Sequence, residues 1–264
     1  MLNSVITHFT FKKKMTMPSS QKVWEKAYQK IDVEHFWTIR DIAFLNVLRK
    51  YVKKGDKVLD VGCGTGKFDV LLTRKGAYTI LLDFSLSVLR NTREIFHSYK
   101  SKEADFILTD IRHIPLKDNS IDVCYSEGVI EHFKNTEKRN ILSEKRRVTR
   151  FGGYVITSCP NRLDVLYQIY KFLFNAIGRW KYGFSNLLSM FDLESLMQSA
   201  GLEIMERKGT LNNLLLFPLY FIFKHSILKR LCYPKPNDPV ALRLGKLYVP
   251  PILGFWLICV GMKK

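Results

Sequence analysis

The sequence has 264 residues, of which 47% are hydrophobic and 25% are charged. This composition suffices for a large buried core and excludes a disordered, collagen-like or coiled-coil chain. Lysine and arginine number 42 against 24 acidic residues, for a formal charge of +18. The excess lies at the ends, since residues 1–30 carry 6 basic and 1 acidic side chains, residues 31–200 carry 26 and 20, and residues 201–264 carry 10 and 3. Such ends favour an anionic partner, nucleic acid or a membrane, although solubilising basic flanks are commoner.

The chain begins with a stretch that does not look like part of the fold. Residues 1–20 are expected to form a disordered leader, with Met15 or Met17 as alternative starts, and residues 21–264 to form a single domain. Residues 21–50 have the pattern of two helices, the second of which stops before the lysines and glycine at 53–55.

From residue 57 onward, short apolar runs alternate with helical patterns, as in a parallel sheet that helices cover on both faces. Strands are expected at 57–61, 78–83, 105–110, 121–126, 153–159, 202–209 and 255–263, and helices at 66–75, 86–98, 136–149 and 192–200. This order predicts an α/β fold with a doubly wound, seven-stranded, mostly parallel sheet of Rossmann-like type.

A glycine-rich segment, KVLDVGCGTGKF, follows the first predicted strand and opens the next helix. Gly62, Gly64 and Gly66 let the backbone pass close to a ligand, and the helix N-terminus offers free N–H groups. A dinucleotide site would read G-x-G-x-x-G, whereas here Asp60 precedes glycines spaced two apart. The pattern resembles motif I of the class I S-adenosylmethionine-dependent methyltransferases.

Later motifs extend this resemblance. Asp83 closes the second strand, beside the glycine loop, where its carboxylate can accept both hydroxyls of a ribose. The block ADFILTDIRHIPLKDNSIDVCYSEGVIEHF is similar to the family pattern after the third strand. The resemblance implies that Asp110 binds the adenine amino group, that the Ile111 amide binds a ring nitrogen, and that Glu127 lies beside the methionine moiety. S-adenosylmethionine is thus the expected cofactor, held by Asp60, Gly62, Cys63, Gly64, Gly66, Asp83, Phe84, Asp110, Ile111 and Glu127.

Three titratable residues follow the fourth strand, at the end where the methyl group would lie. His132 is the best candidate for a general base, with Glu127 and Glu131 as further catalytic candidates, because an oxygen or acidic-carbon acceptor must lose a proton. Capping of the next helix is an equally good interpretation of His132. Methyl transfer from a sulfonium needs no metal, and the five scattered cysteines indicate neither a metal site nor a disulfide framework, in keeping with a reducing cytoplasm.

The resemblance is closest to the small-molecule subgroup that includes the quinone-biosynthesis methyltransferases, in GVIEHF and in FGGYVITSCPN, where Phe151 replaces the usual proline. Two stretches, 160–190 and 210–250, match no named pattern and are expected to be substrate-facing insertions. The first is rich in apolar side chains, namely Leu163, Val165, Leu166, Tyr167, Ile169, Tyr170, Phe172, Leu173 and Phe174. A lid over a lipophilic acceptor, for O- or C-methylation, is the favoured interpretation.

The sequence also bears on a membrane partner, on RNA methylation and on a non-catalytic role. Basic residues near both insertions suggest peripheral contact of a cytoplasmic protein with an anionic membrane, while no apolar run is long enough to span one. RNA methylation is a less favoured alternative, because the residues after the fourth strand, 126–129, include no aromatic that stacks on a flipped base. A non-catalytic binding subunit is disfavoured by the intact motif residues. The sequence leaves the acceptor and the oligomeric state open.

Overall fold

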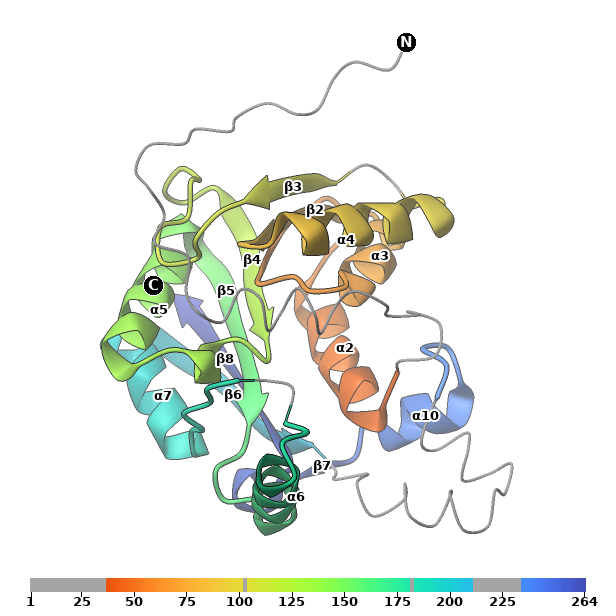
Figure 1. Cartoon of the computed structure of the whole chain (residues 1–264). Coiled ribbons are helices and arrows are strands. Elements are labelled where there is room, and N and C mark those ends of the chain that lie inside the picture. Colours follow the sequence, from red (N-terminus) through yellow and green to blue (C-terminus); the bar gives the residue numbers. More distant parts are fainter. Residues whose placement is uncertain (1–36, 102–103, 181–182, 211–233) are drawn as a thin grey trace.

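The computed structural model describes residues 37–101, 104–180, 183–210 and 234–264. The predicted leader, the first of the two helices expected in 21–50 and most of the stretch 210–250 lie outside the described residues. The remaining predicted elements are all within them (Figure 1).

A mixed sheet forms the centre of the molecule, with strand order β3-β2-β1-β4-β5-β8-β6-β7. Its strands are β1 (Lys57–Val61), β2 (Tyr78–Asp83), β3 (Asp105–Leu108), β4 (Ile121–Glu127), β5 (Thr149–Pro160), β6 (Leu202–Thr210), β7 (Tyr248–Val249) and β8 (Trp256–Lys263). Strands β1 to β5 are parallel, and β8 lies antiparallel between β5 and β6. The doubly wound α/β fold is therefore confirmed, but the expected count of seven strands was wrong. The eighth, β7, pairs only two residues with β6 and is too short to show an alternating pattern.

Helices cover both faces of this sheet (Figure 1). They are α2 (Ile39–Tyr51), α3 (Lys67–Arg74), α4 (Leu86–Ser98), α5 (Asn135–Val148), α6 (Val165–Ala176), α7 (Met190–Ser199) and α10 (Pro239–Leu244), with short 3-10 helices η2 (Ile130–His132) and η3 (Pro251–Leu253). Helices α2, α3, α4 and α10 lie on one side of the sheet in the view of Figure 1, and α5 and α7 lie on the other. The four predicted helices after the glycine loop agree with α3, α4, α5 and α7 to within two residues.

The apolar side chains of the central strands point alternately to the two faces of the sheet and form an apolar layer on each. Val58 packs with Trp37 and Phe44 under α2, whereas Leu59 packs with Leu142 of α5 on the opposite face. Because successive side chains of a strand point to opposite faces, one apolar run supplies both layers. Helix starts are set by hydroxyl caps, as at Ser85, whose Oγ accepts a hydrogen bond from the Val88 amide at the start of α4.

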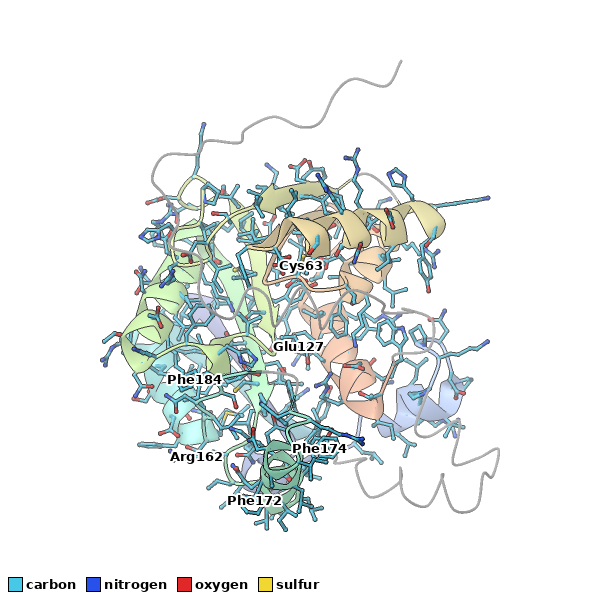
Figure 2. The ribbon with its side chains drawn as sticks, viewed as in Figure 1. Cys63, Glu127, Arg162, Phe172, Phe174 and Phe184 are labelled. Carbon is cyan, nitrogen blue, oxygen red and sulfur yellow. The ribbon has the colours of Figure 1, made fainter. Side chains whose placement is uncertain are left out.

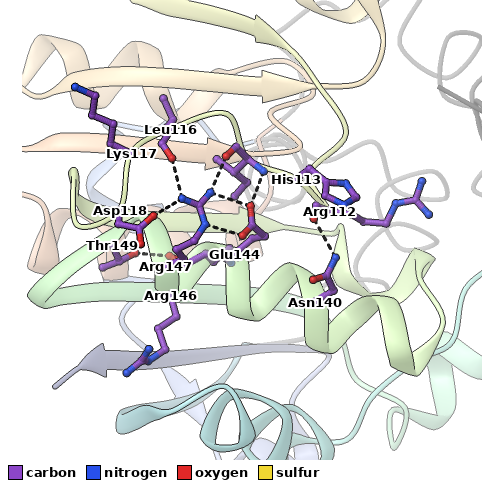
Figure 3. A network of polar contacts seen from close by, with 12 residues as sticks. Arg112, His113, Leu116, Lys117, Asp118, Asn140, Glu144, Arg146, Arg147 and Thr149 are labelled. Atoms are coloured by element: carbon purple, nitrogen blue, oxygen red, sulfur yellow. Dashed lines mark hydrogen bonds and ion pairs between the residues drawn. The ribbon is translucent and has the colours of Figure 1, made fainter. Parts of the chain in front are cut away.

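The loop between β3 and β4 is held against α5 by Arg147 (Figure 3). Its guanidinium donates to the carbonyl oxygens of Ile114 and Leu116 at 2.7 and 2.9 Å and forms ion pairs with Glu144 and Asp118. Glu144 also accepts a hydrogen bond from the Ile114 amide at 2.7 Å. Arg147 and Glu144 thus fix a loop that follows the third strand and has no secondary structure of its own.

The order of the strands places the site. Strand β1 pairs with β2 on one side and β4 on the other, so the chain reverses its winding direction between them. In open parallel sheets, ligands bind at the carboxyl ends of the strands at such a switch point. The glycine loop, Asp83 and Glu127 follow or end these three strands and therefore lie at one edge of the sheet.

Candidate functional site

The glycine loop connects β1 to α3 and has a backbone conformation that other residues rarely adopt. Gly62, Gly64 and Gly66 have φ angles of +81°, +52° and +62°. A Cβ on Gly66 would lie 2.6 Å from Cγ2 of Thr92, and one on Gly62 would lie 2.7 Å from Cγ2 of Val129. Both conformation and space therefore require glycine here. The loop is fixed further by Thr92, whose hydroxyl donates to the carbonyl oxygen of Gly64 at 2.5 Å.

Asp83 ends β2 beside this loop. Its carboxylate accepts hydrogen bonds from the amides of Ser85 at 2.9 Å and Gly64 at 3.4 Å. Burial raises the pKa of Asp83 to about 6, although the hydrogen bonds from these amides lower it in part. The carboxylate is thus fixed in direction by the backbone and suits a neutral, hydroxyl-bearing ligand.

Asp60 lies on β1 directly below the loop and is also buried. Burial and the neighbouring Asp69 raise the pKa of Asp60 well above its ordinary value, and burial raises the pKa of Asp69 to about 6. The hydroxyl of Tyr125 donates to Asp69 Oδ2 at 2.8 Å. This carboxyl pair therefore keeps a proton to a higher pH than an exposed carboxyl does.

Asp110 lies two residues beyond the end of β3, not within the strand expected at 105–110, and it pairs with Arg112. Nε of Arg112 donates to both carboxylate oxygens at 2.9 and 3.0 Å, and Nη2 donates to Oδ2 at 2.6 Å. Burial alone would raise the pKa of Asp110, but the hydrogen bonds from Arg112 lower it. Ile111 is buried in the core. An adenine amino group at Asp110 would have to share the carboxylate with Arg112.

Cys63 and Phe84 adjoin these loops. Cys63 is buried between Gly62 and Gly64, where burial raises the pKa of its thiol well above the usual range, so the thiol is not a reactive group. Phe84 directly follows Asp83 and is half-buried. Figure 2 shows Cys63 and Glu127 near the middle of the molecule, above α6.

Glu127 ends β4 and contacts residues that the sequence did not single out. Nη2 of Arg40, at the start of α2, lies 3.3 Å from Glu127 Oε1 and 2.7 Å from Asp41 Oδ1. The Arg40 guanidinium also stacks 4.1 Å from the ring centroid of Trp256, at the start of β8. Lys67 of α3 pairs with Asp41 at 2.9 Å. The first described helix and the last strand of the sheet therefore meet at the carboxyl end of β4.

Glu131 and His132 lie in η2, the turn that follows β4. Burial raises the pKa of Glu131 to about 8, so its side chain is largely neutral at pH 7. Burial lowers the pKa of His132. His132 Nδ1 lies 2.7 Å from the carbonyl oxygen of Phe184, which can only accept, so Nδ1 carries the proton and Nε2 is the basic nitrogen. Nε2 lies 3.7 Å from Glu131 Oε1.

Two buried polar atoms at this end of β4, Oε2 of Glu131 and Nε1 of Trp256, make no hydrogen bond within the described ranges. Oε1 of Glu127 makes no hydrogen bond there either, and its partner is the Arg40 guanidinium in the ion pair at 3.3 Å. A Cβ on Gly128 would lie 3.6 Å from Cζ2 of Trp256 and 3.8 Å from Oε1 of Glu131, so both side chains border the same point. Buried polar groups normally have partners, and a bound molecule would supply them here.

The glycine loop and Asp83, at the centre of this site, fit an adenosyl cofactor. The glycine loop gives the close backbone approach, and Asp83 is fixed as a hydroxyl acceptor at the switch point. Arg40, Asp69 and Trp256 are the neighbours that sequence reasoning missed. Asp69 could have been noticed in the sequence, because it is an acid in the first turn of the helix that follows the glycines. Arg40 and Trp256 are far from the motifs in sequence, and only the folded chain brings them to the site.

Comparison with known proteins agrees with this geometry. Residues 59–157 match a family described as "Methyltransferase domain". Malonyl-[acyl-carrier protein] O-methyltransferase of Yersinia pestis is 36% identical over 119 residues, which cover 44% of this chain and 42% of that protein. A mouse tRNA (carboxymethyluridine(34)-5-O)-methyltransferase is 30% identical over 146 residues, 54% of this chain and 20% of that protein. The match thus spans less than half the length of either relative.

Solved structures share the fold at low sequence identity. A SAM-dependent methyltransferase from Thermotoga maritima has a TM-score of 0.61 at 20% identity, covering 92% of this chain and 99% of that one. The [4+2]-cyclase SpnF has a TM-score of 0.59 at 15% identity, covering 89% and 84%. The resemblance predicted from the glycine loop is confirmed by the family match and by the fold. Residues 59–157 thus match a methyltransferase domain, the chain has the class I methyltransferase fold, and S-adenosylmethionine is its expected cofactor.

Proposed function

We propose that this protein transfers a methyl group from S-adenosylmethionine to an oxygen atom of a small, lipophilic molecule. Asp83 would hold the ribose hydroxyls, the glycine loop would lie against the cofactor, and Asp110 would hold the adenine amino group. Glu127, with Arg40, would border the methionine end. When bound, the cofactor supplies an electrophilic methyl group, so the protein's tasks are alignment, exclusion of water and removal of a proton.

The observation that carries the proposal is the 2.7 Å contact between His132 Nδ1 and the carbonyl oxygen of Phe184. Because Nδ1–H is directed at the Phe184 carbonyl oxygen, Nε2 is the nitrogen that would take the proton of an acceptor hydroxyl as the new carbon–oxygen bond forms. The lowered pKa keeps the imidazole neutral at pH 7. Glu131, largely neutral, can donate a hydrogen bond to the acceptor, and Trp256 Nε1–H is a second donor nearby.

An oxygen acceptor is favoured over a carbon or nitrogen acceptor by the relatives. Three malonyl-[acyl-carrier protein] O-methyltransferases, from Hamiltonella defensa, Yersinia pestis and Serratia marcescens, are 37%, 36% and 32% identical over their matched parts. A lipophilic acceptor is supported by the apolar residues around α6, the helix that follows the carboxyl end of β5.

The first experiment measures cofactor binding by calorimetry with S-adenosylmethionine and with its demethylated product. We expect both to bind. If neither binds to the folded protein, the enzyme proposal is wrong and the chain is a binding subunit that retains the fold.

The second experiment follows labelled methyl groups into fractionated cell extract. We expect label in the lipid-soluble fraction, and label in RNA would overturn the proposed acceptor class. With that fraction as substrate, His132→Gln should lower kcat by about a hundredfold or more because the base is lost, while affinity for the demethylated product stays unchanged. The exposed His113, changed to Gln, serves as the matched control. Equal loss of kcat in both variants would contradict the role of His132.

A further inference from the structure

Helix α6 directs its apolar side away from the protein. Of its twelve residues only Tyr167 is buried, against Trp180 and Phe255. The exposed side carries a continuous apolar stripe at helical spacing, and some of these side chains are more than half exposed: Val165 67%, Ile169 51%, Phe172 71% and Leu173 54%. An ordinary surface helix has the opposite arrangement, with its apolar stripe facing the core. Figure 2 shows Phe172 on the outer side of α6, away from the sheet.

A second element adds to this surface. The side chain of Asn161, just before α6, donates to the carbonyl oxygens of Pro251 and Gly254, which ties η3 to the start of the helix region. Ile252 and Leu253 of η3 are 65% and 71% exposed. We define the apolar face as Val165, Leu166, Ile169, Phe172, Leu173, Ile177, Ile252 and Leu253. Single exposed apolar residues are common on proteins, but a cluster contributed by two separate elements indicates an interaction surface.

Beyond Asp164, which caps the start of α6, the charges along this part of the chain are positive. The sequence contains no Asp or Glu from Val165 to Phe191, but it contains Lys171, Arg179 and Lys181. Arg179 is exposed just beyond the end of α6. Lys171 Nζ donates to the carbonyl oxygen of Ser185 at 3.2 Å and lies 5.8 Å from the Trp180 ring centroid. The apolar face is therefore bordered by positive charge and by aromatic rings.

We propose that the apolar face of α6 and η3 docks on an anionic membrane surface. The apolar side chains would enter the boundary between headgroups and acyl chains, while Lys171 and Arg179 lie among the anionic headgroups. Trp180 and Tyr170 at the border match the place that such rings take at membrane interfaces. No described helix is long and apolar enough to cross a bilayer, so the contact is with its surface.

A membrane fits this surface better than a protein partner does. The apolar side chains project outward from a helix and from a separate turn, so they can enter a flat lipid surface together. The chain as a whole carries +18, which gives long-range attraction to an anionic surface. The docked face lies near the carboxyl ends of the strands, so a lipophilic acceptor would reach the site from the bilayer side.

The test is flotation of the full chain with vesicles of phosphatidylcholine alone and with about a third phosphatidylglycerol. We expect binding to the anionic vesicles that weakens as salt rises, because the charges are solvent-exposed. Ile169→Ser with Phe172→Ser should weaken binding by at least about tenfold, since both exposed side chains lose their transfer into the membrane. Arg179→Gln should weaken it by about fivefold.

Phe151→Ser is the matched control. Phe151 is 63% exposed and lies near the start of β5, the opposite end of that strand from α6, so this change should leave vesicle binding unaltered. As a depth probe, Phe172→Trp should be quenched by brominated phosphatidylcholine in anionic vesicles, and Phe151→Trp should not. Circular dichroism of each variant shows whether it is folded.

Absence of vesicle binding, or equal binding by the serine double variant and the wild type, would overturn the proposal. Binding of a purified acidic acyl carrier protein that Ile169→Ser with Phe172→Ser abolishes, without vesicle binding, would assign the apolar face to a protein partner instead. Neither result depends on cofactor binding, which the calorimetry measures separately, so failure of the docking surface is distinguishable from failure of the proposed enzyme.

Discussion

Asp83 combines burial with a fixed direction, and the two have different consequences for a ligand. The Ser85 and Gly64 amides orient the carboxylate, while burial without a neighbouring cation raises its pKa to about 6. Ribose hydroxyls donate to a charged carboxylate more strongly than to a neutral carboxyl group. The side chain is therefore ready for its ligand at pH 7 but is close to losing its charge.

Cofactor binding should therefore depend on pH through Asp83. Since the bound form needs the charged carboxylate and the pKa of the free protein is about 6, affinity is full above pH 7 and falls below pH 6, by up to about tenfold per pH unit. Calorimetry with the demethylated product from pH 5 to 8 measures this. In Asp83→Asn, affinity at pH 7 should fall at least about tenfold and the pH dependence should flatten.

The control for this prediction is Asp118→Asn, because Asp118 is an exposed carboxylate in the loop before β4. It should bind the product as the wild type does at every pH. A wild-type affinity that is constant between pH 5 and 8 would show that Asp83 does not contact the ligand through its charged form.

For single residues, the sequence was informative where all residues of a motif lie in one segment. The glycine loop and Asp60 are contiguous, so their pattern showed the family resemblance from which the cofactor was predicted. The neutral state of Glu131 was not predictable, because it depends on burial, and the pairing of Asp110 with Arg112 depends on a side-chain direction. Arg40 and Trp256 come from opposite ends of the described chain, and only the assembled sheet brings them together.

Different features determine where each helix and strand begins and ends. Helix α4 was predicted at its observed residues because Ser85 caps it and its apolar spacing is regular. Strand β5 begins at Thr149, four residues before the predicted start, since its early residues are mostly exposed and pair with β4 around an irregularity. The outward direction of the apolar stripe of α6 was not predictable, because periodicity shows that a helix has an apolar side but not which way that side faces.

The loop between β3 and β4 depends on a single arginine. Arg147→Met removes two hydrogen bonds to backbone carbonyl oxygens and two ion pairs, and it leaves Glu144 with one partner fewer. We expect the free energy of unfolding to fall by about 2 kcal/mol, a value reduced by the partial exposure of the side chain. Urea denaturation followed by circular dichroism measures the change.

Arg139→Met on the same helix is the comparison for this variant. Arg139 is exposed, so its replacement should change stability by less than about 0.5 kcal/mol. If the two variants are equally stable, Arg147 does not anchor the loop.

The whole molecule is organised around a strand that comes after all the others in the sequence. Strand β8 lies between β5 and β6 and pairs with both along most of its length. Lys263, near its end, donates to the carbonyl oxygens of Arg146, Arg147 and Thr149, which binds the strand to the end of α5. The sheet therefore consists of two parts that only β8 joins.

A chain that ends at Gly254 should consequently fail to fold cooperatively. Removing β8 leaves β5 and β6 without their shared partner and exposes the apolar layers on both faces. We expect a broad thermal transition without a sharp midpoint and aggregation on gel filtration. Lys264→Ala, which removes only an exposed ion pair with Glu203, should melt as the full chain does. A truncated chain with a sharp transition would show that the first five strands are an independent unit.

The central position of β8 also bears on how the protein is made. Strands β5 and β6 are both synthesised before β8, so until β8 follows them each presents an open edge to the surrounding solution. Open edges of this kind recruit other extended chains. The nascent protein is thus most exposed to mispairing in the interval between the synthesis of β6 and that of β8.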